Sequence, residues 1–166
     1  AARAAEVFGA LVETMALLRA PGGCPWDAEQ THVSLIRYLV EETYEVVEAV
    51  ETGGEPNMPL LCEELGDVLL QVVFHSDIAA ANPKGFDIVQ VVEGLVQKLR
   101  SRHPDVFEAG SGGSSEAPRT AAEQQAAWDA LKKKEKSERG ALDGVPPHLP
   151  ALAMAEKTAS KARNCL

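Results

Sequence analysis

The sequence has 166 residues, which is enough for one domain with its own core and too few for two ordinary ones. Its net charge of −9 disfavours non-specific binding to nucleic-acid polymers and anionic membranes, although a bound divalent cation can reverse the local sign for a small phosphorylated ligand. The hydrophobic share of 45% and aromatic share of 5% are typical of a soluble protein packed with aliphatic side chains.

Six helices are predicted from apolar residues at helical spacing and from the prolines and glycines between them. In chain order they cover residues 2–19, about 27 or 31 to 51, 58–81, 87–102, 120–138 and 151–163. Residues 20–26 separate the first two, because two prolines and two glycines cannot continue a helix. No segment alternates β-branched residues between hairpin turns, so the predicted fold is all-α.

Residues 108–118, with the sequence EAGSGGSSEAP, are a low-complexity run that predicts a flexible linker. The linker divides the chain into a helical module at residues 1–107 and a C-terminal helical extension at residues 119–166. The four helices expected before it suit a module that resembles a four-helix bundle.

The cysteines and the chain ends bear on location. Cys24, Cys62 and Cys165 form no CxxC pair and no zinc set, which predicts free thiols and a cytoplasmic protein. No uncharged apolar run reaches the roughly 20 residues that span a bilayer, and the acidic, amphipathic start differs from a secretory signal. The chain lacks an initiator Met and stops abruptly at Leu166, which indicates a processed or excised fragment.

The most informative feature of the sequence is an asymmetry of charge. From Tyr38 to Pro83 there is no Lys or Arg, yet there are ten acids. Helices that face water usually mix both signs and gain from pairs four residues apart. The acids of this segment therefore need another form of compensation.

Four of these acids lie among apolar residues at helical spacing. Glu42 falls on the stripe of Leu35, Leu39, Val46 and Ala49, with Glu45 at its border, and Glu64 shares a stripe with Leu61 and Val68. Asp67 follows Glu64 on the same side. A buried carboxylate without a partner costs several kcal/mol or takes up a proton, so a cation is the simplest compensation. Magnesium prefers such oxygen ligands.

Two other interpretations of the acids were weighed. One acidic pair on a helix is nearly always a solvated surface, but two pairs on helices joined by a short turn favour a metal site. A di-iron bundle needs two Glu-x-x-His pairs and two further glutamates. Only Glu29 and His32 fit that spacing, near the start of a helix, so iron is disfavoured.

The ordered motifs of this chain resemble those of the MazG family. They are Gly23-Cys24-Pro25-Trp26-Asp27-x-x-Gln30-Thr31, Glu41-Glu42-x-x-Glu45, Glu64-x-x-Asp67, Lys98-Leu99-x-x-Arg102-His103-Pro104-x-Val106-Phe107, Trp128-x-x-Leu131-Lys132 and Ala141-Leu142-Asp143-x-Val145-Pro146. Any single acidic motif is weak evidence, but the set in this order spans almost the whole chain and is highly specific.

The resemblance implies an all-α enzyme that hydrolyses nucleoside triphosphates to monophosphates and pyrophosphate in nucleotide-pool sanitation. It also implies magnesium, with manganese as a substitute, and a homodimer or higher oligomer packed through helices. The metal ligands are expected at Glu42, Glu45, Glu64 and Asp67. Glu41 is expected as a further ligand or as the group that activates water, and attack at the α or β phosphorus stays open, as do the preferred base and sugar.

Four residues outside the acidic motifs are candidates for substrate binding. Lys98 and Arg102 share a helix face and are expected to contact phosphates, while Trp26 either covers a nucleobase or caps the core. His103 either contacts phosphate or ends a helix beside Pro104. Where the family often has a second arginine and a second histidine, this chain has Ser101 and Asp105, which reduces positive charge at the expected phosphate end.

Two alternative functions remain open. One is a non-catalytic helical module in which the acids bind a structural metal or a basic partner protein. The other is a narrow deoxyuridine triphosphatase of the same fold superfamily. Magnesium-dependent release of pyrophosphate distinguishes the first, and the range of substrates distinguishes the second.

Overall fold

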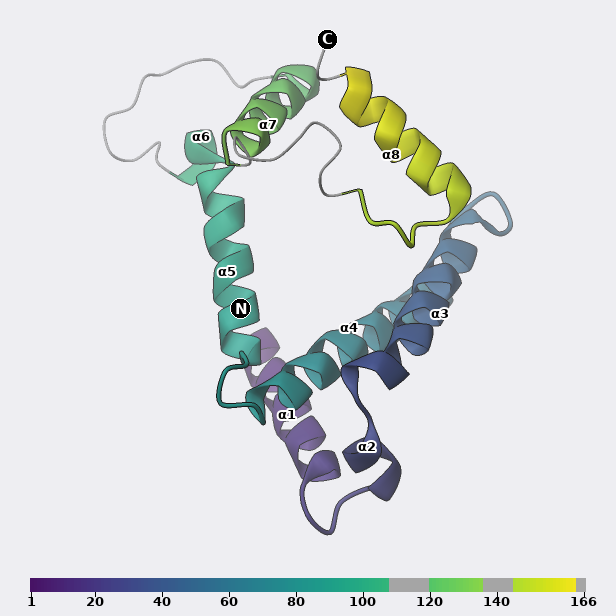
Figure 1. Cartoon of the computed structure of the whole chain (residues 1–166), viewed down its shortest axis with the longest axis vertical. Coiled ribbons are helices and arrows are strands. Elements are labelled where there is room, and N and C mark those ends of the chain that lie inside the picture. Colours follow the sequence, from purple (N-terminus) through teal and green to yellow (C-terminus); the bar gives the residue numbers. More distant parts are fainter. Residues whose placement is uncertain (108–119, 136–144, 164–166) are drawn as a thin grey trace. The chain divides into compact units, whose positions relative to one another are not determined.

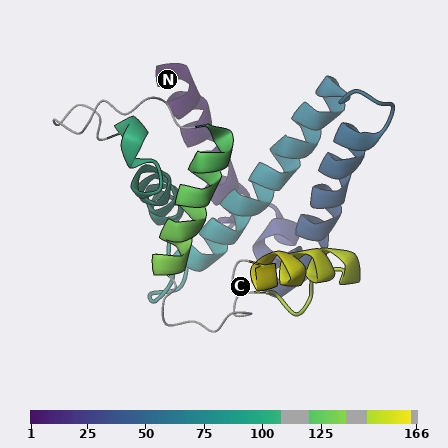
Figure 2. The ribbon, with the colours of Figure 1, turned by 90° about the horizontal axis from the view of Figure 1, so that it is seen from above.

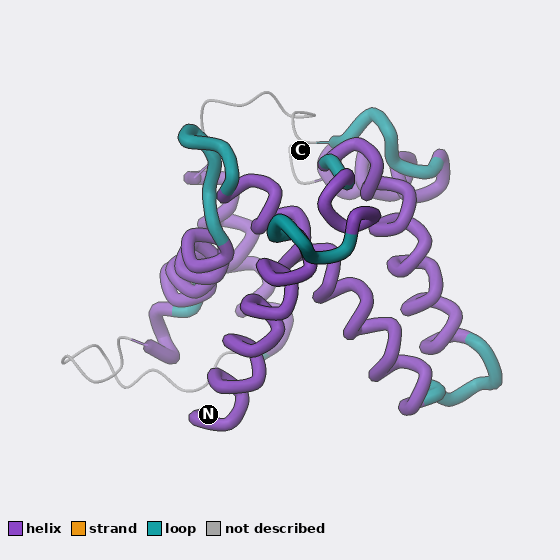
Figure 3. The backbone as a smooth tube through the Cα atoms, turned by 90° about the horizontal axis from the view of Figure 1, so that it is seen from below, coloured by secondary structure: helices purple, strands orange, loops and turns teal. Residues whose placement is uncertain are grey.

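A computed structural model describes residues 1–107, 120–135 and 145–163, and the regular structure within these ranges is entirely helical (Figures 1 and 3). The helices are α1 (Ala2–Arg19), α2 (Pro25–Glu29), α3 (His32–Glu51), α4 (Met58–Ala80), α5 (Ile88–Ser101), α6 (Pro104–Phe107), α7 (Ala121–Glu135) and α8 (Ala151–Arg163). The all-α prediction is confirmed. Each helix in the described part of the chain is too short or too polar to cross a bilayer.

Most predicted helix ends agree with the structure to within one residue. The predicted helices at 2–19 and 151–163 match α1 and α8. The predicted helix at 58–81 is one residue too long at its C-terminal end, and the one at 87–102 is one residue too long at both ends. The prediction missed α2 and α6. Both begin at a proline, Pro25 and Pro104, and proline is well tolerated in the first turn because the helix does not use its missing N–H group there. Trp26 was predicted to lie in the segment between two helices, and that prediction was wrong, because Trp26 lies in the short helix α2.

Some predictions fall outside the described residues. They are the linker at 108–118, the end of the predicted helix at 136–138, the motif residues 141–144 and Cys165. Cys24 and Cys62 are free thiols, as predicted. The chain forms two compact units, Ala1–Lys98 and Leu99–Leu166, which are described separately below.

The first unit is organised around a hairpin of α3 and α4, which lie side by side along their lengths (Figures 1 and 2). A capping box starts α3, because the Thr31 and Ser34 side chains each bind the other's backbone N–H, at 3.1 and 2.9 Å. Gly53 and Gly54 then turn the chain with φ of +95° and +84°, a region that residues with a Cβ rarely adopt. Asn57 caps α4 by accepting a hydrogen bond from the Leu60 backbone at 3.3 Å.

The core of this unit joins α1, α3 and α4. Met15, Leu35, Val73 and Phe74 are each at most 2% exposed and pack together. Burying side chains of this size contributes about 1.5–3 kcal/mol each, which fixes the rotation of each helix about its axis. Because Leu35 faces this core, the residues two turns further along α3 on the same stripe also turn toward α4.

Candidate metal centre

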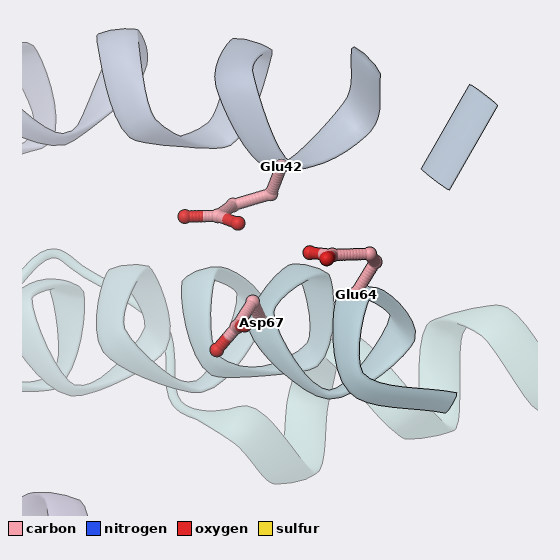
Figure 4. Close-up of side chains that lie close together, drawn as sticks. All are labelled: Glu42, Glu64 and Asp67. Carbon is pink, nitrogen blue, oxygen red and sulfur yellow. The ribbon is translucent and has the colours of Figure 1, made fainter. Parts of the chain in front are cut away.

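Three carboxylates meet between the two helices of the hairpin. Glu42 projects from α3 toward Glu64 and Asp67 on α4, and one oxygen of each lies within 4.8 Å of the other two (Figure 4). Glu64 is only 7% exposed, and the other two are half-buried. The structure thus brings together three of the four residues predicted as metal ligands.

The fourth predicted ligand, Glu45, lies at the edge of this group. Its side chain is exposed, and its proximity raises the pKa of both Glu42 and Glu64. It lies one turn after Glu42 on α3. Its role as a ligand stays a prediction.

The electrostatics of the cluster favour a cation. Burial raises the pKa of Glu42, and the charges of Asp67 and Glu45 raise it further. The pKa of Glu64 is also raised, first by burial and then by Glu45. Groups in such an environment either hold a proton or bind a positive ion, because several carboxylates cannot all stay ionised close together without one.

The donor set fits magnesium in its chemistry. All three groups offer hard oxygen ligands, which Mg²⁺ prefers. Neighbouring ligands of an octahedral Mg²⁺ lie about 3 Å apart, since each bond is about 2.1 Å. The three oxygens lie within 4.8 Å of one another, so the side chains would draw closer around a bound ion.

Glu41 lies outside the three-carboxylate group. It is exposed, and its charge acts on Arg37, one turn earlier on α3. Arg37 donates a hydrogen bond to the Tyr38 hydroxyl, and its guanidinium lies 4.4 Å from the centre of the Tyr38 ring. The hydrogen bond raises the pKa of Arg37, and the charge of Tyr38 raises it further. Because Arg37 precedes the acidic segment, the charge argument from the sequence left out this cation.

The ring of Trp26 contacts the ring of Tyr38, which lies one turn before Glu42 on α3. The two rings meet edge to face with centroids 5.8 Å apart, and Trp26 remains 50% exposed. An exposed ring held by a second ring suits stacking on a planar ligand, since only one part of its surface is used by the protein.

The predicted phosphate contacts lie at the boundary between the units and beyond it. Lys98 is the last residue of the first unit and is exposed. In the second unit, the Arg102 guanidinium lies 5.9 Å from the Trp128 ring, and His103 Nδ1 contacts the Leu99 carbonyl oxygen at 2.7 Å. The contact of His103 fits the helix-ending alternative, while phosphate binding by all three residues stays a prediction.

Sequence reasoning missed a polar group one to two turns beyond the carboxylates on α4. Gln71 is 5% exposed, and its Oε1 has no hydrogen-bond partner among the described residues. His75 is half-buried, and its Nε2 also lacks a partner in this part of the chain. The available signal was the stripe Glu64, Val68, Gln71 and His75, whose polar members continue past the acidic pair.

A shallow pocket of about 210 Å³ lies beside these two side chains. It is lined by Leu39, Gln71, Val72, His75, Ser76, Phe86 and Val91. Leu39 precedes Glu42 by one turn of α3, and Gln71 follows Asp67 by one turn of α4. The pocket therefore adjoins the carboxylate group along both helices.

The match to a known family covers this hairpin. A family model described as the MazG nucleotide pyrophosphohydrolase domain matches residues 30–107, which contain the acidic cluster and the pocket. This match identifies residues 30–107 as a MazG domain. The MazG match begins at Gln30, just before α3, and ends with α6.

Relatives from three bacteria are similar over nearly all of the chain. The nucleoside triphosphate pyrophosphohydrolase/pyrophosphatase MazG of Thermotoga maritima is 41% identical over 94% of this chain and 56% of its own length. The protein named nucleoside triphosphate pyrophosphohydrolase in Mycobacterium tuberculosis is 44% identical over 92% of this chain and 45% of its own length. The protein of the same name in Escherichia coli (strain K12) is 38% identical over 93% of this chain and 56% of its own length. The chain thus spans about half the length of these curated relatives.

Proposed function

We propose that this MazG chain is a magnesium-dependent pyrophosphohydrolase that converts nucleoside triphosphates to monophosphates and pyrophosphate. The observation that carries the proposal is the meeting of Glu42, Glu64 and Asp67 in a half-buried group with raised carboxylate pKa values. The names of the relatives from Thermotoga maritima, Mycobacterium tuberculosis and Escherichia coli support the same activity.

The four predicted ligands would bind the ion together. Glu42, Glu64 and Asp67 would bind it from the two helices, and Glu45 would complete the set from the edge. When bound, magnesium neutralises charge on the phosphate oxygens and lowers the pKa of a coordinated water. Manganese suits the same oxygen ligands and is expected to substitute.

The residues around the ion would orient the substrate and move a proton. Glu41, exposed beside the cluster, would accept the proton of the attacking water or act as a further ligand. Lys98 and Arg102 would bind the phosphate groups, with His103 as a further contact. Trp26, which is held by its contact with the Tyr38 ring, would stack on the nucleobase.

We further propose that two or more copies assemble through helices. Five large apolar side chains form one stripe on the outer face of α3 and are each at least 41% exposed. They are Val33, Ile36, Val40, Tyr44 and Val47. A stripe of this kind suits packing against a second copy.

The physiological role that fits this activity is sanitation of the nucleotide pool in the cytoplasm. The free thiols of Cys24 and Cys62 support a reducing compartment. Nucleoside triphosphates are the expected partners, with no role for nucleic-acid polymers or membranes.

The decisive experiment measures pyrophosphate and monophosphate release from a panel of ribo- and deoxyribonucleoside triphosphates, with magnesium and with a chelator. We expect release that needs the cation and that falls at least 100-fold in Asp67→Ala. Glu48→Gln, which changes an exposed acid of α3, is the matched control and should keep wild-type rates. Absence of release by folded protein would instead favour a non-catalytic interaction module, and release from dUTP alone a narrow dUTPase.

A further inference from the structure

Two histidines join α3 to α4 at the open end of the hairpin. His32 is the first residue of α3, and His75 lies in the second half of α4. Their Nδ1 atoms are 2.8 Å apart, whereas the ring centres are 5.1 Å apart and the ring planes are parallel to within 2°. The two nitrogens are therefore the parts of the rings that meet, and they form a hydrogen bond between the helices.

This hydrogen bond depends on how many protons the pair carries. Between neutral rings, one Nδ1 carries a hydrogen and the other offers its lone pair. One extra proton leaves the bond in place, because an imidazolium still faces a ring with a free lone pair. A second extra proton puts a hydrogen on both Nδ1 atoms and a positive charge on both rings, so the contact at 2.8 Å has to open.

The start of α3 offers nothing that balances two positive charges. His32 is the only ionisable side chain in the first turn of α3, and that turn holds no acid. The helix N-terminus is itself partly positive, because its first backbone N–H groups have no partner within the helix. Burial lowers the pKa of His75, and the charge of His32 lowers it further. The pair therefore resists the second proton as long as the contact is closed.

The charged residues on the other elements near His75 leave the pair uncompensated. Among the described residues they are Arg19 of α1, Asp77 of α4, and Lys84 and Asp87 of the connection to α5. Arg19 and Asp77 bind each other at 2.7 Å, and Asp87 caps α5 by accepting a hydrogen bond from the Gln90 backbone at 2.9 Å. Within this part of the chain, the charge of His32 is the one that acts on the pKa of His75.

We propose that the His32–His75 pair is an acid-sensitive latch that holds the first turn of α3 against α4 and releases it when both rings are protonated. The latch is separate from the proposed hydrolysis and does not depend on it. Because the pKa of folded His75 lies below its ordinary value of 6.5, the stabilisation by the closed contact is complete above that pH. It falls as the pH drops from 6.5 through the lower pKa of the closed pair.

The hydrophobic core determines how far the release extends. Leu35, three residues after His32, is 1% exposed and belongs to the same core cluster as Val73 and Phe74 of α4. The residues at 31–34, in contrast, are all exposed. Release therefore frees one turn of α3 and ends at Leu35, while the rest of the hairpin stays packed.

The released turn is linked to α2 through one glutamine. The Gln30 side chain accepts a hydrogen bond from the Ser34 hydroxyl at 2.7 Å and donates one to the Trp26 carbonyl oxygen at 2.9 Å. Movement of Ser34 away from α4 would therefore weaken the link between α2 and α3. Arg19 still holds α2 through the Asp27 carbonyl oxygen. We expect the effect of acid to reach α2 without detaching it.

The carboxylate cluster responds to acid in the opposite direction. The raised pKa values of Glu42 and Glu64 mean that the folded, metal-free protein binds protons more tightly than the unfolded chain, so acid stabilises it through these groups. A loss of protection at the start of α3 on acidification therefore cannot come from them.

The first arm of the test is a pH titration of the wild-type protein with ¹⁵N-labelled histidine, followed by NMR in chelator. We expect the Nδ1 resonances of His32 and His75 to change together in two steps, the second of them below pH 6.5. His148, an exposed histidine of the second unit, should change in one step. Independent single steps for His32 and His75 would overturn the proposal.

The second arm measures how fast two backbone amides exchange their hydrogens with solvent. The Leu35 amide bonds to the Thr31 carbonyl oxygen at 3.2 Å across the first turn of α3, and the Thr52 amide bonds to the Glu48 carbonyl oxygen at 3.0 Å at the other end. After correction for the intrinsic effect of pH, lowering the pH by one unit from about 6.5 should speed exchange at Leu35 about three- to tenfold relative to Thr52, because an opening that takes up one proton changes at most tenfold per pH unit. An unchanged ratio of the two rates would contradict the latch.

His32→Gln separates the latch from a general effect of acid. Glutamine can still donate an amide hydrogen to His75 Nδ1 but cannot take up a proton, so the acid-induced rise at Leu35 should disappear. His148→Gln, the matched control, should keep the wild-type rise. A rise of wild-type size in His32→Gln would reject the proposal. Because His32 is exposed, the substitution spares the core, and the titration of the wild-type protein decides if the variant does not fold.

Discussion

Arg19, at the end of α1, donates a hydrogen bond from Nε to Asp77 Oδ2 on α4 at 2.7 Å. The same guanidinium donates to the backbone oxygen of Asp27 in α2 and lies 5.3 Å from the centre of the Phe74 ring. One side chain thus connects three helices of the first unit. Asp77 is also one of the acids of the segment without basic residues, and its partner comes from outside that segment.

Loss of this ion pair should destabilise the first unit without changing the carboxylate cluster. The side chains of Arg19 and Asp77 are 13% and 29% exposed, so Arg19→Met leaves a partly buried acid without its partner. We expect a loss of about 1–3 kcal/mol in the free energy of unfolding, measured with urea, because Asp77 loses its partner. Arg3→Met, on the exposed start of α1, should change it by less than about 0.5 kcal/mol. Equal losses in the two variants would contradict this role for Arg19.

Neutralising Glu64 should weaken metal binding and stabilise the metal-free protein. Glu64→Gln keeps the size of the side chain and removes a charge that is buried next to Glu45. We expect a higher melting temperature than wild type in chelator, and a smaller rise when magnesium is added, as followed by calorimetry. An ion at 100 times its Kd stabilises a protein by about 2.7 kcal/mol, so loss of binding is readily measured. The same melting temperature as wild type in both conditions would count against the cluster as a metal site.

The stability of the metal-free protein should also depend on pH through the buried carboxylates. The ordinary carboxyl pKa is 4.5, and both Glu42 and Glu64 are raised above it in the folded state. The folded protein therefore binds protons more tightly than the unfolded chain, and these two groups lower stability as the pH rises from about 4.5 through their folded pKa values. We expect the stability difference between wild type and Glu42→Gln to widen from pH 4.5 to 7.5 in chelator. A difference that stays constant would show that the Glu42 pKa is not raised.

Fluorescence can test the proposed contact of Trp26 with the base. The chain has two tryptophans, so Trp128→Phe leaves Trp26 as the only one. In that background a nucleoside triphosphate with magnesium should change the emission, because a stacked base replaces water over the half-exposed ring. Trp26→Ala should raise KM about 10-fold with a smaller effect on kcat, since stacking contributes about 1–3 kcal/mol per base. An emission that does not respond to nucleotide would exclude the contact.

The hairpin and its acids were predictable because local rules decide both. The ends of α3 and α4 follow from Thr31, the Gly53-Gly54 turn and Asn57, whose roles depend on a few neighbouring residues. Glu42 and Glu64 were predicted to face protein from helical periodicity, and the structure gives both of them that orientation. Periodicity worked here because each helix has a single face turned toward its neighbour.

The features that sequence reasoning missed depend on contacts between distant residues. The stacking of His32 on His75 joins positions 43 residues apart, and helical spacing alone gives no sign of it. The Arg19–Asp77 pair spans 58 residues and was equally hidden. The short helix α2 was overlooked for a different reason, because Pro25 reads as a breaker although it also suits a first turn.

The position of the carboxylates on both legs of one hairpin has a mechanical consequence. An ion held by Glu42 and Glu64 would act as a reversible cross-link that closes a chain loop of about 20 residues, comparable in its entropic effect to a disulfide that contributes roughly 3 kcal/mol. The Gly53-Gly54 turn, which is costly to order, lies inside that loop. The concentration of the ion would then determine how stable the hairpin is, and also whether the protein can act on a substrate.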